Sequence, residues 1–141
     1  MIDLCRKHMK MKKIRVAVID DIRDILELIE YNLNKEGMDV DIYTDSSIAL
    51  TEIVKNKPDL VISDWMMPGQ DGLEVFRQLK NNKRTKNIPL LMLTCKSSLR
   101  DYREARQAGA RDYIVKPVRM DELIRRIKLL LPLDRLTKRF V

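Results

Sequence analysis

Three carboxylates, one hydroxyl and one ammonium group stand at the ends of apolar runs in this chain. The residues are Asp20, Asp21, Asp64, Thr94 and Lys116. Neighbouring carboxylates repel one another unless a proton or a hard cation neutralises them. Oxygen ligands without His or Cys favour Mg²⁺, Mn²⁺ or Ca²⁺ over zinc, and open coordination positions suit Mg²⁺ with a phosphoryl ligand. Because an ammonium and a hydroxyl are natural partners of phosphoryl oxygens, the set indicates phosphoryl chemistry assisted by a metal ion.

This chemistry requires elements that bring the five positions together. Continuous apolar runs predict buried strands at 14–19, 40–43, 60–63, 90–94 and 112–115. Helical spacing of apolar residues predicts helices at 22–35, 46–55, 72–79, 97–108 and 120–131. Strands that alternate with helices predict an α/β fold with a parallel sheet and helices on both faces. Five units favour a flavodoxin-like, doubly wound (βα)5 architecture, a five-stranded parallel sheet in the order 2-1-3-4-5, over a closed barrel.

The predicted strand order places the candidate residues at one edge of the sheet. In open α/β sheets, ligands bind beyond the carboxyl ends of the strands. Since the first and third strands are neighbours in this order, we expect Asp20, Asp21 and Asp64 to share one crevice. Thr94 should flank this crevice and Lys116 should lie nearby. The alternative for any single position is an aspartate or threonine that caps a helix, but five such positions at one edge favour a site.

Other kinds of chemistry lack the residues they need. The loop after the first strand reads Asp-Asp-Ile-Arg, which repels a bare phosphate, and no glycine-rich nucleotide motif occurs. Two cysteines exclude a disulfide framework, and a Ser-His-Asp relay would depend on His8 alone. No apolar run approaches the ~20 residues of a membrane span, and residues 1–13 lack the apolar core of a secretory signal. We therefore expect a cytoplasmic protein that does not associate with membranes.

The formal net charge of +7 is unevenly distributed along the chain. Residues 1–13 carry five Lys/Arg against one Asp, and residues 132–141 carry three against one. We expect a basic flexible leader at 1–13 and a short basic tail at 132–141. Because the body is nearly neutral and no DNA-reading motif occurs, direct nucleic-acid binding is not expected. Within the body, residues 14–74 are acidic and residues 75–131 are basic.

Four segments resemble bacterial two-component response-regulator receiver domains of the CheY-like type. They are VIDD at 18–21, PDLVISDWMMPGQDGLEV at 58–75, IPLLMLT at 88–94 and AGARDYIVKP at 108–117. They occur in the order and spacing of that family, and the resemblance covers residues 14–131. It implies a phosphoacceptor signalling switch, which is not a conventional enzyme although it catalyses its own aspartyl phosphorylation and dephosphorylation. The tail after residue 131 is too short for an attached output domain.

The resemblance also implies roles for individual residues. Asp64 would accept a phosphoryl group from a phosphohistidine of a sensor histidine kinase or a phosphotransfer protein. Mg²⁺, or Mn²⁺ in its place, would be held by Asp20, Asp21, Asp64 and the backbone carbonyl of Met66. A carboxylate is a weak nucleophile, so transfer depends on positioning and on neutralisation of charge, which agrees with this ligand set.

The remaining implied roles concern catalysis by side chains and the switch. Lys116 would bind a phosphoryl oxygen, and Thr94 would move its hydroxyl to the phosphoryl group. Tyr113 would follow Thr94 as an aromatic switch, and Pro117 would follow a cis peptide bond. Without the resemblance, Tyr113 reads as a half-buried aromatic residue of a strand and Pro117 as the proline of a helix start.

Helix 97–108, strand 112–115 and helix 120–131 form the face that the resemblance implies for output. Its basic residues are Arg100, Arg103, Arg106, Arg125 and Arg126. We expect this face to bind an acidic downstream protein or a second copy of the chain, and the alternative is a solvated basic surface. Two further readings stay open: the receiver part of a larger DNA-binding regulator or hybrid kinase, and, least supported, a basic nucleic-acid-binding protein.

Overall fold

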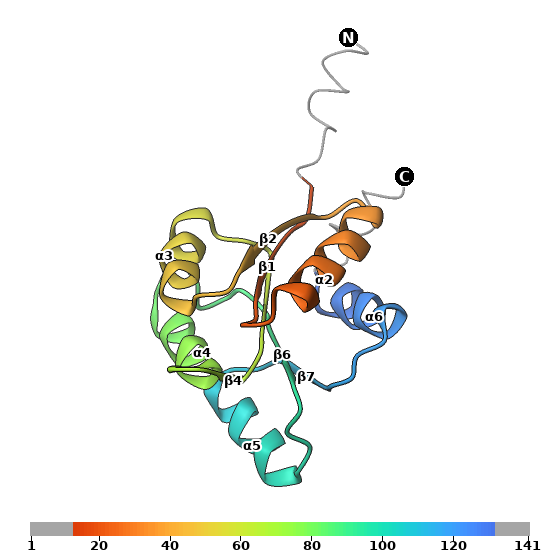
Figure 1. Cartoon of the computed structure of the whole chain (residues 1–141). Helices are drawn as coiled ribbons and strands as arrows, with labels where there is room; N and C mark the ends of the chain where they lie inside the picture. Colours follow the sequence, from red (N-terminus) through yellow and green to blue (C-terminus); the bar gives the residue numbers. More distant parts are fainter. Residues whose placement is uncertain (1–12, 132–141) are drawn as a thin grey trace.

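The computed structural model describes residues 13–131 of the chain, and Figure 1 shows their arrangement. The elements are β1 (Arg15–Ile19), α2 (Arg23–Lys35), β2 (Asp39–Tyr43), α3 (Ser46–Asn56), β3 (Leu60–Ser63), β4 (Met66–Met67), β5 (Gln70–Asp71), α4 (Gly72–Asn81), β6 (Leu90–Thr94), α5 (Leu99–Ala108), β7 (Asp112–Val115) and α6 (Met120–Leu130). The basic leader, except for Lys13, and the tail lie outside the described residues. Between residues 13 and 131, no helix has both the length and the apolar composition needed to cross a membrane.

The five long strands form one parallel sheet in the order β2-β1-β3-β6-β7. The short strands β4 and β5 pair only with each other, as an antiparallel hairpin. With this hairpin set aside, the observed order is the predicted 2-1-3-4-5, so the flavodoxin-like prediction is confirmed. The order makes β1 and β3 direct neighbours, which brings the residues after these two strands to the same place.

The sheet has a separate apolar core on each face. On one face α3, α4 and α5 pack against alternate strand residues such as Ala17, Val61 and Met92. On the other, α2 and α6 pack against the intervening residues, such as Val18 and Ile62. Figure 1 shows the same division of the helices about the sheet. Because successive strand side chains point to opposite faces, continuous apolar runs serve both cores at once.

Element boundaries follow local chemistry and lie within two residues of the predicted ones. Asp45 caps α3 by accepting hydrogen bonds from two backbone N–H groups, and Asp71 caps α4 in the same way with one. The helix predicted from residue 97 begins at Leu99, because Ser98 and Asp101 form a capping box that defines its start. It ends at Ala108, and the Gly109 that follows has a φ of 115°, which is accessible to glycine. The segment 64–71, which lies between the predicted strand 60–63 and the predicted helix 72–79, contains the hairpin of β4 and β5.

Candidate functional site

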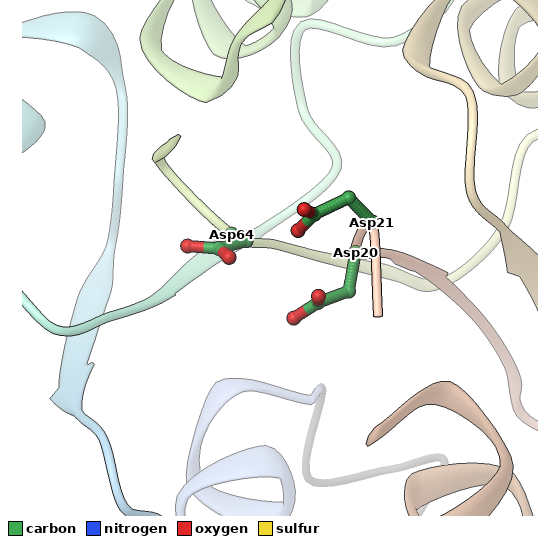
Figure 2. A group of neighbouring side chains, drawn as sticks. All are labelled: Asp20, Asp21 and Asp64. Atoms are coloured by element: carbon green, nitrogen blue, oxygen red, sulfur yellow. The ribbon is translucent and has the colours of Figure 1, made fainter. Parts of the chain in front are cut away.

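Three aspartates gather at the carboxyl edge of the sheet, as the sequence predicts. Asp20 and Asp21 follow β1, and Asp64 follows β3. One carboxylate oxygen from each lies within 4.8 Å of the other two, and Figure 2 shows the side chains next to one another. Asp20 and Asp64 are buried, whereas Asp21 is exposed. Asp20 also accepts a hydrogen bond from the backbone N–H of Ile22 at 2.9 Å, which holds its carboxylate against the turn before α2 without capping that helix.

Lys116 reaches this acidic group from the end of β7. Its Nζ donates to Asp20 Oδ2 at 2.9 Å and to Asp64 Oδ2 at 3.1 Å. Burial lowers the pKa of Lys116, but its hydrogen bonds to the two carboxylates outweigh burial and raise the pKa above its ordinary value. Burial also raises the pKa of Asp64, against the opposing effect of Lys116. The ammonium therefore offsets part of the repulsion between carboxylates that are held away from water.

Thr94 ends β6 beside the acidic group and is buried. Its carbonyl accepts the backbone N–H of Lys116 at 2.8 Å, so the two residues are joined through the pairing of β6 with β7. Its Oγ1 accepts the backbone N–H of Lys96 at 3.3 Å. The hydroxyl is thus hydrogen-bonded to the loop between β6 and α5. On the neighbouring strand, the Lys116–Pro117 peptide bond is cis, as the resemblance implies.

Tyr113 lies inward, in an aromatic cluster that extends from the acidic group to α5. Its ring makes edge contacts with Trp65, at 6.5 Å between centroids, and with Tyr102, at 5.9 Å. Its hydroxyl donates to the carbonyl of Lys96 at 2.5 Å. Burial, with a smaller contribution from the Asp101 carboxylate, raises the pKa of Tyr113 to about 12, so the phenol stays protonated at neutral pH.

The side chain of Lys96 forms a second link across this cluster. Its ammonium lies 4.1 Å from the centroid of the Trp65 ring and 4.0 Å from Asp101 Oδ1 on α5. One residue therefore joins the loop after β3, the loop after β6 and the start of α5. Neither this contact nor the packing of Tyr102 on Tyr113 was predicted, because no sequence spacing relates these residues.

An open cleft of about 570 Å³ adjoins the acidic group. Asp21, Met66, Gln70 and Lys96 are among the residues that line it. Met66 lies two residues after Asp64, and its backbone N–H donates to Asp64 Oδ1 at 3.4 Å while its side chain is exposed. The cleft leaves the Asp21 side of the acidic group open to solvent.

The five arginines of the expected output face differ in their surroundings. On α5, Arg100 and Arg103 are exposed and line a surface hollow with Leu99. Arg106, on the same helix, donates to the carbonyl of Arg111 at 2.6 Å. On α6, two arginines pair with carboxylates: Arg125 with Glu122, and Arg126 with both Glu122 and Asp112. The basic charge that lacks a paired carboxylate on this face therefore lies on α5.

Comparison with known proteins agrees with this architecture. The model of the response regulator receiver domain family matches residues 16–128. Among solved structures, the chain is similar to the chemotaxis protein CheY4 of Vibrio cholerae, with 28% identity and a TM-score of 0.82 over 85% of this chain and 100% of that one. It is also similar to the receiver domain of the Francisella response regulator 1452, with 33% identity and a TM-score of 0.77 over 84% and 96% of the two chains.

The chain belongs to the response regulator receiver domain family. Receiver domains of two-component systems are signalling switches rather than conventional enzymes. The acidic group at the carboxyl edge offers three carboxylates that could hold a metal ion.

Gly72, the first residue of α4, packs against the backbone of Asp64. A Cβ at this position would lie 2.1 Å from the Asp64 carbonyl oxygen, and a backbone atom cannot move aside as a flexible side chain can. We expect Gly72→Ala to lower the free energy of unfolding by about 3 kcal/mol, measured by urea denaturation. Gly69→Asn is the control, because asparagine tolerates the φ of 71° there and no atom lies within 4 Å. Equal stability of the two variants would refute this account of Gly72.

Proposed function

We propose that this receiver domain is a cytoplasmic phosphorylation switch in which Asp64 accepts a phosphoryl group. The observation that carries the proposal is the ammonium of Lys116, which bridges Asp20 and Asp64 beside the exposed Asp21. Phosphohistidine, on a sensor histidine kinase or a phosphotransfer protein, is the donor that the family implies. In this proposal residues 14–131 form the receiver domain, with the basic leader and tail on either side.

The transfer exchanges one bond for another. A carboxylate oxygen of Asp64 attacks phosphorus in line with the imidazole nitrogen of the donor. The new O–P bond forms as the P–N bond breaks, and the bonding electron pair returns to the imidazole nitrogen. Lys116 is placed to hold an oxygen of the incoming phosphoryl group, and the Thr94 hydroxyl to donate to another. These contacts position a weak nucleophile and offset the negative charge that gathers around it.

The donor set fits a hard divalent cation. Asp20, Asp21 and Asp64 supply carboxylate oxygens within 4.8 Å of one another, and the site contains no nitrogen or sulfur ligand. We propose that these three residues and the backbone carbonyl of Met66 hold Mg²⁺, or Mn²⁺ in its place. When bound, such an ion neutralises charge on the phosphoryl oxygens and on the carboxylates. The buried Asp20 would be the least mobile of these ligands.

Incubation with acetyl phosphate and Mg²⁺ should add one phosphoryl group per chain, measured by intact mass. Asp64→Asn should abolish the addition because it removes the nucleophile, and EDTA should abolish it in the wild type. Asp45→Asn is a matched control, since Asp45 is an exposed aspartate that caps α3 outside the acidic group. It should retain the addition. Labelling of Asp64→Asn to the wild-type extent, or labelling undiminished by EDTA, would contradict the proposal.

We further propose that Thr94 passes the change at Asp64 to Tyr113 through the loop after β6. Thr94 Oγ1 accepts from the backbone N–H of Lys96, and the carbonyl of Lys96 accepts from Tyr113. If Thr94 turns toward new phosphoryl oxygens, its hydrogen bond to this loop is lost. The acceptor of the Tyr113 hydroxyl then loses part of its support. A local change in charge thereby shifts a two-state aromatic cluster.

The ammonium of Lys96 lies over the Trp65 ring. This contact should stabilise the arrangement described above relative to the one proposed to follow phosphorylation of Asp64. Beryllofluoride is used here in place of the phosphoryl group on Asp64. Cation–π contacts contribute about 0.5–1 kcal/mol at exposed sites. Lys96→Met should therefore lower the beryllofluoride concentration that converts half of the chains roughly two- to five-fold. Trp65 is the single tryptophan of the chain, so its fluorescence reports the transition. Lys96→Arg keeps the cation and should respond as the wild type does. An unchanged midpoint in Lys96→Met would show that the contact does not restrain the switch.

The α5 surface is the part of the expected output face best suited to an acidic partner. Arg100 and Arg103 are exposed there, together with the apolar side chains of Leu99 and Tyr102. Apolar area surrounded by charge is typical of protein interfaces. We propose that an acidic downstream protein or a second copy of the chain binds here more tightly after phosphorylation of Asp64.

Charge reversal on α5 should weaken this association. The double variant Arg100→Glu, Arg103→Glu is compared with the wild type after treatment with beryllofluoride. We expect it to reduce the affinity for the acidic partner, or the affinity of self-association measured by sedimentation, by about tenfold or more. Arg125→Glu is the control, because Arg125 already pairs with Glu122 on α6. If Arg125→Glu reduced the affinity as much as the α5 variant does, the interface would not be specific to α5 and the proposal would be wrong.

A further inference from the structure

A dense group of cations lies at the edge of the sheet opposite to Asp64. Helices α3, α4 and α5 run back against the direction of the strands, so their C-terminal ends and the following segments gather at this amino edge. Seven exposed cations occur there, and we call them the amino-edge patch: Lys55, Lys57, Lys83, Arg84, Lys86, Arg106 and Arg111. The patch is separate from both the acidic group and the exposed surface of α5 around Leu99.

The patch has three parts: the end of α3, the segment after α4, and the end of α5 with the turn that follows it. Hydrogen bonds join the first two parts. Arg84 Nε donates to the carbonyl of Val54 at 3.2 Å, which links the segment after α4 to the end of α3. Lys80 Nζ donates to the carbonyls of Lys86 and Ile88 at 3.1 and 3.3 Å, which holds the same segment against α4.

The third part of the patch adjoins this segment. The ideal Cβ position of Gly109 falls 2.5 Å from Lys80 Cγ, so the turn after α5 lies against the stem of this lysine. Arg106 donates to the carbonyl of Arg111 at 2.6 Å. Burial, and in second place the charge of Arg111, lowers the pKa of Lys80, which agrees with the proximity of the two cations. The three segments that carry the seven cations therefore lie next to one another at the amino edge.

Carboxylates do not neutralise this surface. Among residues 13–131, the ion pairs within 4.0 Å involve none of the seven cations. Helix dipoles account for cations in the last turns of helices, such as Lys55 and Arg106. They do not account for Lys83, Arg84 and Lys86, which lie in the segment between α4 and β6.

The chemistry of the patch distinguishes between polyanionic partners. None of the exposed large apolar side chains of the described residues lies in it, so it offers neither the apolar centre of a protein interface nor an anchor for insertion into a membrane. Exposed amides are interspersed with its cations, at Asn56, Asn81, Asn87 and Gln107. Cations with amide donors are typical of contacts to the phosphates and sugars of nucleic acids.

We propose that the amino-edge patch binds the phosphate backbone of duplex nucleic acid without reading its sequence. The chain enters the domain at this edge, because Lys13 precedes β1, and residues 1–13 carry five Lys/Arg. The whole-chain charge count did not predict this patch, since a count does not show where cations gather in the fold. The site is independent of the proposed phosphorylation, because Asp64 lies at the other end of β3.

The test is fluorescence anisotropy of a labelled DNA duplex, titrated with the full chain at several salt concentrations. The variant Lys55→Gln, Lys83→Gln, Lys86→Gln removes three cations whose side chains are exposed. Each phosphate contact contributes about 0.9 to the slope of log affinity against log salt, so the slope should become shallower by about 3. The matched control is Arg100→Gln, Arg103→Gln, Arg119→Gln, which removes the same charge from other exposed positions and should keep the wild-type slope.

Two further measurements complete the experiment. Thermal unfolding of the patch variant should match that of the wild type, so that a loss of binding reports the surface and not the fold. Co-sedimentation with vesicles that contain phosphatidylserine measures the competing partner. Absence of salt-dependent binding to DNA, an equal loss in the control variant, or binding to vesicles with none to DNA would each overturn the proposal.

Discussion

The contact of the Lys116 ammonium with Asp20 and Asp64 is the interaction on which the site depends. Two largely buried carboxylates and an exposed third would repel one another strongly without it. The lysine follows β7, and the two aspartates follow β1 and β3. Lys116 and Asp20 are 96 residues apart in the sequence. The sheet order is therefore a requirement of the chemistry, because only β3 and β6 separate β1 from the strand that delivers the cation.

The same edge of the sheet also places the loop after β6 between the acidic group and the aromatic cluster around Tyr113. Thr94 ends the strand between β3 and β7, and the next residues of the chain hold Tyr113 and contact Trp65. The apolar cores on the two faces are closely packed and fix the strands in position. Beyond the strand ends, hydrogen bonds and aromatic edge contacts rather than core packing hold the arrangement.

The two ends of the domain have opposite electrostatic character for one structural reason. In a parallel sheet every strand end of one kind lies at one edge, so polar residues after strands and residues after helices are separated in space. Three carboxylates gather at the edge that contains Asp64, and the seven cations of the amino-edge patch lie at the edge that contains Lys83 and Arg111. The proposed phosphoryl transfer and the proposed binding of a polyanion therefore use opposite edges of the sheet.

The alternation of strands and helices, the strand order and the five residues at the carboxyl edge could all be predicted from the amino-acid sequence. Apolar periodicity and the residue after each strand carry this information locally. Only the tertiary structure decided that Lys96 lies on Trp65, that Arg126 is neutralised by Asp112, and that cations from three segments form one patch. These contacts join side chains distant in sequence, and they depend on how each helix crosses the sheet and which rotamer each side chain adopts. Periodicity places a residue on a face of its element, but packing selects its partner.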